Sequence, residues 1–250
     1  MKFIRFKKND YIGYGLWEED KVKAIEGDIF GHYVVTDHFY NIEEIEFLTP
    51  CIPSKIICVG LNYKSHAEEM KMPLPEEPII FLKPPSSVLA HNSVIIMPEM
   101  SEQVDYEAEL GLVIGKRGKN IRPEEAYDYI LGATCFNDVT ARDLQKKDGQ
   151  WTRAKSFDTF APFGPCIATG VNYDNLGIEL VLNGETKQKS NTSDFIFSVG
   201  RLISFISSIM ELMPGDVIAT GTPSGVGKLY KGDIVEVKIQ DVGILKNYVR

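Results

Sequence analysis

The stretch Val104-Asp105-Tyr106-Glu107-Ala108-Glu109-Leu110-Gly111-Leu112-Val113-Ile114-Gly115 decides the fold. Its β-branched and apolar residues, closed by a glycine, predict a strand. Residues two apart on a strand point to the same face, so Glu107 and Glu109 are expected side by side, opposite an apolar face that begins at Ala108. Two adjacent carboxylates repel each other and resist burial unless a positive charge compensates them.

A divalent cation with hard oxygen ligands is the simplest compensating charge for this pair. Asp138 ends another short apolar run, residues 133–138, and is a candidate third ligand. The alternative is that Glu107 and Glu109 form a solvated strand face near a lysine, which is the usual interpretation of Glu-x-Glu. The polar residues 140–145 and the segment around Lys155 argue against it, because they could bind an acidic ligand.

Six motifs, taken in their order and spacing, resemble the fumarylacetoacetate hydrolase family. They are Gly60-Leu61-Asn62-Tyr63 with His66 and Glu69, Phe81-Leu82-Lys83-Pro84, Asp105-Tyr106-Glu107-Ala108-Glu109-Leu110, Asn137-Asp138-Val139-Thr140-Ala141-Arg142-Asp143, Lys155-Ser156-Phe157-Asp158 and Thr220-Gly221-Thr222-Pro223-Ser224-Gly225-Val226-Gly227. The resemblance runs from about Ile56 to the C-terminus, nearly four-fifths of the chain, and the first fifty residues match only loosely.

The strand-rich pattern favours a mainly β core with flanking helices. The resemblance implies an α+β fold dominated by strands, a mixed β-sandwich roll of the fumarylacetoacetate hydrolase C-terminal-domain type that is usually dimeric. We expect a small N-terminal α+β domain over residues 1–50 and a catalytic domain over residues 51–250, with the junction in the proline-containing segment 48–54.

The resemblance also implies the roles of individual residues. Glu107, Glu109 and Asp138 would bind Mg²⁺ or Mn²⁺, which would activate the carbonyl of a small 2-oxo acid. His66, oriented by Glu69, would deprotonate the attacking water. Lys155 would stabilise oxyanion charge. Further candidates for contact with the substrate or the water are Gln145, Arg142, Lys83, Thr192 and Thr222; Arg142 could equally pair with Asp143, and Lys83 could be a surface lysine.

The expected activity is hydrolysis of a C–C bond in acylpyruvate-type β-diketo acids. The metal cluster alone does not choose among reactions, so isomerisation of 2-hydroxyhepta-2,4-diene-1,7-dioate, decarboxylation of 5-oxopent-3-ene-1,2,5-tricarboxylate and oxaloacetate decarboxylation stay open as alternatives. Two interpretations from other classes also stay open. One is a non-catalytic β domain with a structural cation, and the other is a glycosidase that uses Glu107 and Glu109.

Composition limits the partners and the compartment. A net charge of −8 over 250 residues disfavours nucleic acid and anionic membranes as partners. No apolar run reaches the roughly 18 residues of a membrane span, and residues 1–10 lack the apolar core of a signal peptide. The four cysteines lie in apolar stretches without metal-site spacing, which predicts free thiols in a cytoplasmic protein.

Local patterns predict four further elements. Residues 198–213 have a wide apolar face and an N-cap at Ser198, which predicts a helix. Asn183-Gly184 predicts a hairpin turn. Residues 143–151 are polar and are expected to form a loop. Residues 63–78 carry His66 and Glu69 but end in a proline-rich segment, so we expect a lid that moves when a ligand binds.

Overall fold

The computed structural model describes all residues, 1–250, and contains twenty strands in three sheets. The largest sheet has twelve strands, in the order β4-β3-β2-β1-β14-β12-β11-β17-β6-β7, with β5 beside β1 and β8 beside β14. Its strands are β1 (Lys2–Lys8), β2 (Tyr11–Glu18), β3 (Lys21–Gly27), β4 (Tyr33–Asn41), β5 (Glu46–Phe47), β6 (Ile56–Val59), β7 (Ile80–Lys83), β8 (Val88–Leu89), β11 (Ala108–Ile114), β12 (Ile130–Asn137), β14 (Ala161–Ala168) and β17 (Val217–Ala219).

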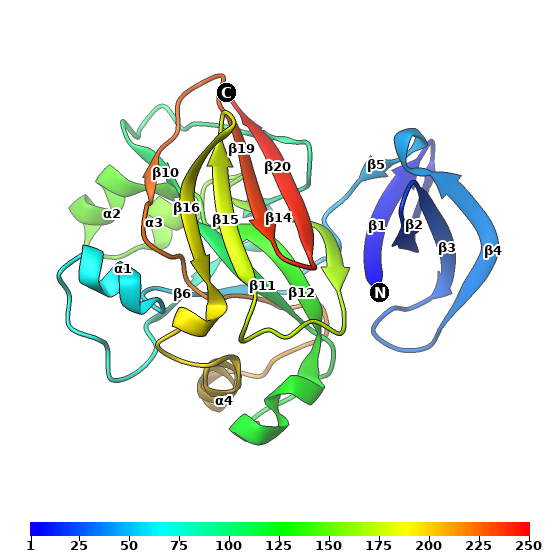
Figure 1. Cartoon of the computed structure of the whole chain (residues 1–250), viewed down its shortest axis with the longest axis horizontal. Helices are drawn as coiled ribbons and strands as arrows, with labels where there is room; N and C mark the ends of the chain where they lie inside the picture. Colours follow the sequence, from blue (N-terminus) through cyan, green and yellow to red (C-terminus); the bar gives the residue numbers. More distant parts are fainter.

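Two smaller sheets complete the strand content. Five strands form the order β16-β15-β19-β20-β9, and three form β13-β10-β18. Their bounds are β9 (Val94–Ile95), β10 (Val104–Tyr106), β13 (Thr140–Ala141), β15 (Gly177–Leu182), β16 (Glu185–Asn191), β18 (Gly227–Lys228), β19 (Ile234–Ile239) and β20 (Gly243–Val249). Figure 1 shows β15, β16, β19 and β20 stacked over β11, β12 and β14, which makes a two-layered body of packed sheets.

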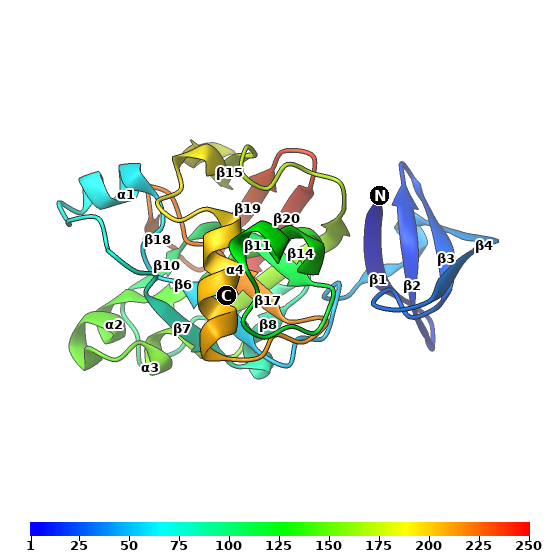
Figure 2. The ribbon, with the colours of Figure 1, turned by 90° about the horizontal axis from the view of Figure 1, so that it is seen from below.

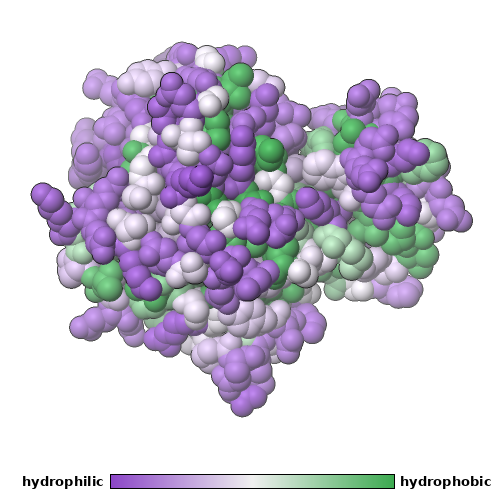
Figure 3. Space-filling view, viewed as in Figure 1, coloured by the Kyte–Doolittle hydropathy of each residue, from purple (hydrophilic) through white to green (hydrophobic).

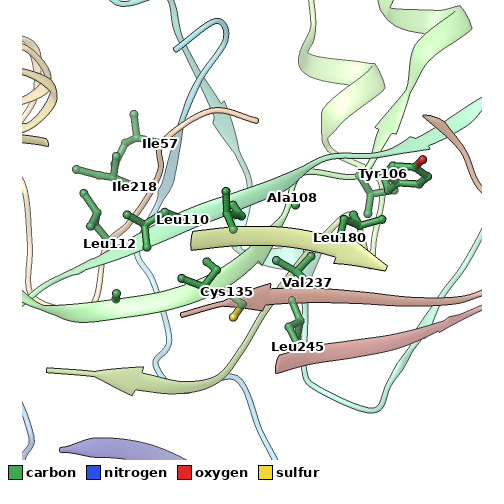
Figure 4. Close-up of a cluster of buried hydrophobic side chains, with 14 of the residues drawn as sticks. Ile57, Tyr106, Ala108, Leu110, Leu112, Cys135, Leu180, Ile218, Val237 and Leu245 are labelled. Carbon is green, nitrogen blue, oxygen red and sulfur yellow. The ribbon is translucent and has the colours of Figure 1, made fainter. Parts of the chain in front are cut away.

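Apolar side chains from both layers fill the space between these sheets. Leu110 and Leu112 of β11 meet Leu180, Val237 and Leu245 of the smaller sheet in one core cluster (Figure 4). All seven residues of β11 are buried, so the strand is covered on both faces rather than on one. Burial of this kind is the main favourable term in folding, and it fixes the strand that carries Glu109.

The α-helices are few and lie outside the sheets. They are α1 (Lys64–Glu69), α2 (Arg142–Asp148), α3 (Thr152–Lys155) and α4 (Val199–Ile209), and the 3₁₀ turns are Ile42–Glu44, Pro85–Ser87, Pro123–Tyr129 and Thr192–Asp194. Helices α1, α2 and α3 lie at one end of the body in both views (Figure 1 and Figure 2). The expected loop over residues 143–151 is wrong, because α2 occupies most of it. None of the helices combines the length and the apolar character of a membrane-crossing segment.

Two predictions from local pattern are confirmed, although the helix predicted over residues 198–213 ends at Ile209. Ser198 caps α4 and accepts a hydrogen bond from the Arg201 N–H, and Asn183-Gly184 turns the chain between β15 and β16. Helix α4 buries its apolar face against the turn Pro123–Tyr129. The expected mainly β fold is therefore confirmed.

Residues 1–50 form a lobe of five strands and one 3₁₀ turn, with no α-helix in the expected α+β piece. The lobe stands at the right of Figure 1 and joins the main body where β1 pairs with β14 through Lys2–Ala168 and Phe3–Ile167. Its outer surface carries exposed apolar residues on β4, among them Val34 and Phe39. Figure 3 shows hydrophobic residues on this side of the lobe, on a face of the molecule that is otherwise mostly hydrophilic.

Candidate active site

The three predicted carboxylates come together where β10 gives way to β11. Glu107 lies between these strands, and its backbone is fixed by two bonds to the end of β12: its N–H donates to Asn137 Oδ1 over 3.0 Å, and its carbonyl accepts the Asp138 N–H over 2.9 Å. In the antiparallel register, Glu109 lies opposite Phe136. Glu107, Glu109 and Asp138 are buried, and each offers an oxygen within 4.8 Å of the others.

Buried cations surround two of these acids. The Lys155 ammonium donates to Glu107 Oε2 over 2.9 Å and to Asp138 Oδ2 over 2.6 Å. Lys83, which is 1% exposed, donates to Asp138 Oδ1 and to the carbonyl of Val139. A surface position for Lys83 is therefore excluded, and its amine is already engaged within the acid cluster.

Arg142 joins the same network instead of pairing with Asp143. Its guanidinium donates to Glu107 Oε1, to Asp105 Oδ2 over 2.9 Å and to Gln145 Oε1 over 2.7 Å. Asp143 turns away and accepts from Ser101. The alternative of an Arg142–Asp143 ion pair is thus wrong. The guanidinium pairs instead with the carboxylates of Asp105 and Glu107, which lie within reach and are buried from solvent.

The two glutamates differ in their charge environment. Burial alone would raise the pKa of Glu107, but the Lys155 and Arg142 cations hold it at about 2. Burial and repulsion by Asp138 and Glu107 raise the pKa of Glu109 well above its usual range. Burial would lower the pKa of Lys155, but attraction by Asp138 and Glu107 outweighs it and raises the value. The cluster thus holds one carboxylate, Glu109, with no cation in hydrogen-bond contact.

The donor set fits a hard divalent ion. Three buried carboxylate oxygens converge, which matches the oxygen ligands that Mg²⁺ and Mn²⁺ prefer. Glu109 accepts only the Gly221 N–H, over 2.8 Å, so its second oxygen remains without a donor. A buried carboxylate in this state is costly unless a charge compensates it, and a bound cation would do so.

Helix α1 brings the predicted dyad to the same cavity. His66 Nδ1 lies 3.0 Å from Glu69 Oε2, and both oxygens of Glu69 also face the Gly225 N–H at 3.2 and 3.3 Å. Glu69 thereby links α1 to the loop 221–227, which follows β17. His66 lines a cavity of about 310 Å³ whose walls also include Glu107, Asp138 and Lys155.

The structure separates the remaining predicted residues by position. Gln145, Arg142 and Thr222 line this cavity. The Thr222 hydroxyl donates to the Ala108 carbonyl and accepts from Gln188, so it is engaged in holding β11. Thr192 lies outside this cavity and lines a different one, where its hydroxyl accepts the Leu176 N–H.

The apolar side of the cavity was not predicted from the sequence. This side consists of Leu61, Met70, Met72, Ile79, Phe81 and Trp151. Period-two alternation along β7 was the available signal for one of them, since Phe81 shares a face with Lys83 and is opposite Leu82, which is 48% exposed. No local signal marked Trp151, which reaches the cavity from the turn between α2 and α3.

Comparisons with known proteins agree with the geometry. Residues 55–250 match the family model for the fumarylacetoacetate (FAA) hydrolase C-terminal domain, and residues 1–50 match the model described as Rv2993c-like, N-terminal. The mitochondrial oxaloacetate tautomerase of Xenopus laevis is 46% identical over 225 residues, which is 85% of this chain and 70% of that protein.

Two solved structures are similar along most of the chain. The 5-carboxymethyl-2-hydroxymuconate delta-isomerase from Mycobacterium smegmatis is 39% identical with a TM-score of 0.94, covering 100% of this chain and 99% of its own. The fumarylpyruvate hydrolase from Pseudomonas aeruginosa, solved in complex with Mn²⁺ and pyruvate, is 34% identical with a TM-score of 0.75, covering 82% and 91%. The resemblance noted from the motifs is confirmed.

Proposed function

The chain belongs to the fumarylacetoacetate hydrolase family, and we propose that it is a Mg²⁺- or Mn²⁺-dependent hydrolase of acylpyruvate-type β-diketo acids. One observation carries the proposal: a single cavity is lined by Glu107 and Asp138 and by His66 of the His66–Glu69 pair. The similar fumarylpyruvate hydrolase holds Mn²⁺ and pyruvate, which supports a divalent ion and a 2-oxo acid as the ligands here.

The residues account for the hydrolytic step. A divalent ion held by Glu107, Glu109 and Asp138 would supply a Lewis acid for the 2-oxo acid. When the Nδ1–H of His66 donates a hydrogen bond to Glu69, the Nε2 atom is free to take a proton from water. The water oxygen adds to the acyl carbonyl, and the bond between that carbon and the neighbouring methylene breaks. The methylene carbon keeps the electron pair and takes up the proton held by His66, which gives pyruvate, and the carboxylic acid formed from the acyl group releases its proton to become a carboxylate.

Lys155 contributes charge rather than a base. Its side chain is 2% exposed, and its ammonium donates to Glu107 and Asp138, so it is a cation held inside the acid cluster. A fixed cation in a water-poor cavity stabilises oxyanion charge as it develops. We therefore expect Lys155→Ala to lower kcat far more than Lys64→Ala, since Lys64 is exposed at the start of α1.

Oxaloacetate tautomerisation is the second candidate, and the 46% identity to the Xenopus laevis tautomerase favours it. The similar delta-isomerase adds support for a reaction that only relocates protons. Such reactions, like decarboxylation, need no attacking water. They therefore depend less on a base that activates water, which separates them experimentally from hydrolysis.

The decisive experiment measures both reactions on one set of proteins. Acetylpyruvate hydrolysis and oxaloacetate enol–keto conversion are followed by ultraviolet absorbance, after removal of metal and after addition of Mn²⁺ or Mg²⁺. We expect hydrolysis to require the ion and to fall about 100-fold in His66→Ala and Glu69→Gln. Hydrolysis that persists in chelator contradicts the metal-dependent mechanism. Absent hydrolysis with rapid metal-dependent conversion of oxaloacetate selects the second candidate.

A further inference from the structure

The cavity has two chemically different ends. Glu107, Asp138 and Lys155 form a charged inner end next to the acid cluster. Apart from polar groups, among them Arg142, Gln145 and Thr222, the rest of the wall is apolar and comes from three segments: the loop after β6, the stretch from the end of α1 into β7, and the turn before α3. Its residues are Leu61, Met70, Met72, Ile79, Phe81 and Trp151. A ligand whose 2-oxo acid group lies at the inner end would place its other end against this wall.

Three residues of the apolar wall are exposed to solvent in the structure. Met70 is 54% exposed, Met72 49% and Ile79 45%, although all three line the cavity. When an apolar group of a ligand covers apolar surface that faces water, the free energy of the complex is lowered. The wall therefore favours a ligand with hydrocarbon at this end over one with a charge there.

Trp151 is held in place against this wall. Its ring packs edge-to-face on Phe81, with centroids 5.2 Å apart. It also approaches Gly60 so closely that a Cβ at that position would lie 3.0 Å from two indole carbons. A side chain at position 60 would therefore push the indole away from its present position, in which it presents an apolar surface to the cavity.

At the outer end of the cavity, no buried cation is free to pair with a second carboxylate of the ligand. Arg142 is committed to Asp105 and Glu107. Lys146 is the one other cation on the wall; it forms no ion pair and is exposed. An ion pair with an exposed lysine is worth little, because water screens it, whereas a carboxylate pressed against apolar side chains loses hydration.

We propose that the substrate carries an uncharged, apolar acyl group at the end remote from its 2-oxo acid group, as an alkanoyl- or aroylpyruvate does. This inference rests on the proposed function, since it places the 2-oxo acid at the acid cluster. It assigns Trp151, Met72 and Ile79 to substrate specificity rather than to the chemical steps.

A matched pair of ligands tests the inference by binding alone. 2-Oxohexanoate and 2-oxoadipate have the same chain length and differ at the far end, which is a methyl group in one and a carboxylate in the other. In calorimetric titrations of the Mn²⁺-loaded protein, we expect 2-oxohexanoate to bind about tenfold more tightly. Met72→Ala and Trp151→Leu should each reduce this preference, while oxalate, which does not reach the wall, should bind both variants as it binds the original protein.

Lysine variants examine the opposite possibility. Tighter binding of 2-oxoadipate, lost in Lys146→Ala and kept in the neighbouring Lys147→Ala, would overturn the proposal, because it would make Lys146 a receptor for a terminal carboxylate. Equal binding of the two ligands would overturn it as well. Lys147 is exposed and does not line the cavity, so it controls for a general loss of positive charge on α2.

Turnover distinguishes failure of this inference from failure of the proposed function. Butanoylpyruvate and succinylpyruvate again differ only in a terminal methyl or carboxylate. A higher kcat/KM for butanoylpyruvate supports the inference, and a higher value for succinylpyruvate overturns it while the hydrolase assignment survives. If neither compound nor acetylpyruvate is hydrolysed with metal present, the proposed function itself is wrong, and the calorimetric comparison still decides whether the wall selects apolar ligands.

Discussion

Glu107 and Glu109 are two residues apart, yet the same substitution should affect them differently. Glu107 pairs with Lys155 and Arg142, whereas Glu109 accepts only the N–H of Gly221. We expect Glu107→Gln to lower the free energy of unfolding of the metal-free protein by about 3 kcal/mol, because two cations lose a buried partner. Glu109→Gln should change it by less than about 1 kcal/mol, because a neutral amide replaces a carboxyl that is costly to ionise. Urea unfolding at neutral pH measures both values.

Metal binding supplies the control for this comparison. Both glutamine variants should lose affinity for Mn²⁺ in calorimetric titration, since each removes one anionic ligand oxygen from the cluster. Equal destabilisation by the two substitutions would show that Glu109 has a charge partner in solution that the geometry does not contain.

At the residue scale, local spacing in the sequence was enough to single out side chains that the structure brings together. Two acids two residues apart in a strand-like stretch, and a histidine and glutamate three apart, can be recognised without knowledge of the fold. Lys83 could not be placed in this way, because its partner Asp138 is 55 positions away and β7 and β12 are not neighbours in the sheet. The apolar wall of the cavity was missed for the same reason, since its three segments meet only in the folded chain.

At the scale of elements, α1 and the segment after it are the least embedded part of the cavity wall. Only Ala67 of α1 is buried, and residues 68–77 are exposed except for half-buried Pro75. We expect amide hydrogen exchange in residues 63–78 to slow when Mn²⁺ and oxalate are added together, because closure would bring His66 towards the ligand. Exchange followed by mass spectrometry tests this lid hypothesis, with α4 as an internal reference. Identical exchange with and without ligand would mean that the dyad is preformed.

The elements that were predicted well from the sequence have capping or turn residues at their ends. Ser198 caps α4 and the Asn183-Gly184 turn closes a hairpin, so both could be placed from a few residues. Helix α2 was not predicted, because it buries only Leu144 and therefore shows no apolar repeat of 3.6 residues. It also has no side-chain cap to mark its start. The break in the strand at Glu107 could not be predicted either, since the backbone of Glu107 is bonded to Asn137 at the end of β12 and to Asp138 directly after it.

At the scale of the whole molecule, the N-terminal lobe shares a hydrophobic core with the main body. Phe3, Ile25 and Ile29 belong to the same buried cluster as Phe163 and Ile167 of β14. Because these residues bury apolar surface against each other, the lobe and the main body stabilise one another. The composition of residues 1–50 does not reveal this dependence, because the partners of its apolar faces lie more than a hundred positions away.

His91 lies at this junction and should make stability depend on pH. Its ring packs against Phe47 of the lobe at 5.2 Å, and its Nδ1 accepts the Lys246 N–H of β20. Burial, with repulsion by Lys246 outweighing attraction by Glu236, lowers the pKa of His91 from 6.5 to about 4. Between these values the unfolded chain binds a proton that the folded chain does not, so acidification through this window lowers the free energy of unfolding.

The His91 contribution should be about 1 kcal/mol, because its partial exposure weakens the effect. We expect urea unfolding from about pH 7 to pH 4.5 to show a steeper loss of stability in the original protein than in His91→Gln, whose amide oxygen can still accept the Lys246 N–H. The carboxylates also titrate at low pH, but their contribution to the free energy of unfolding is the same in both proteins. It therefore cancels in the difference between the two pH profiles. Parallel pH profiles would contradict a neutral, buried His91 at the junction.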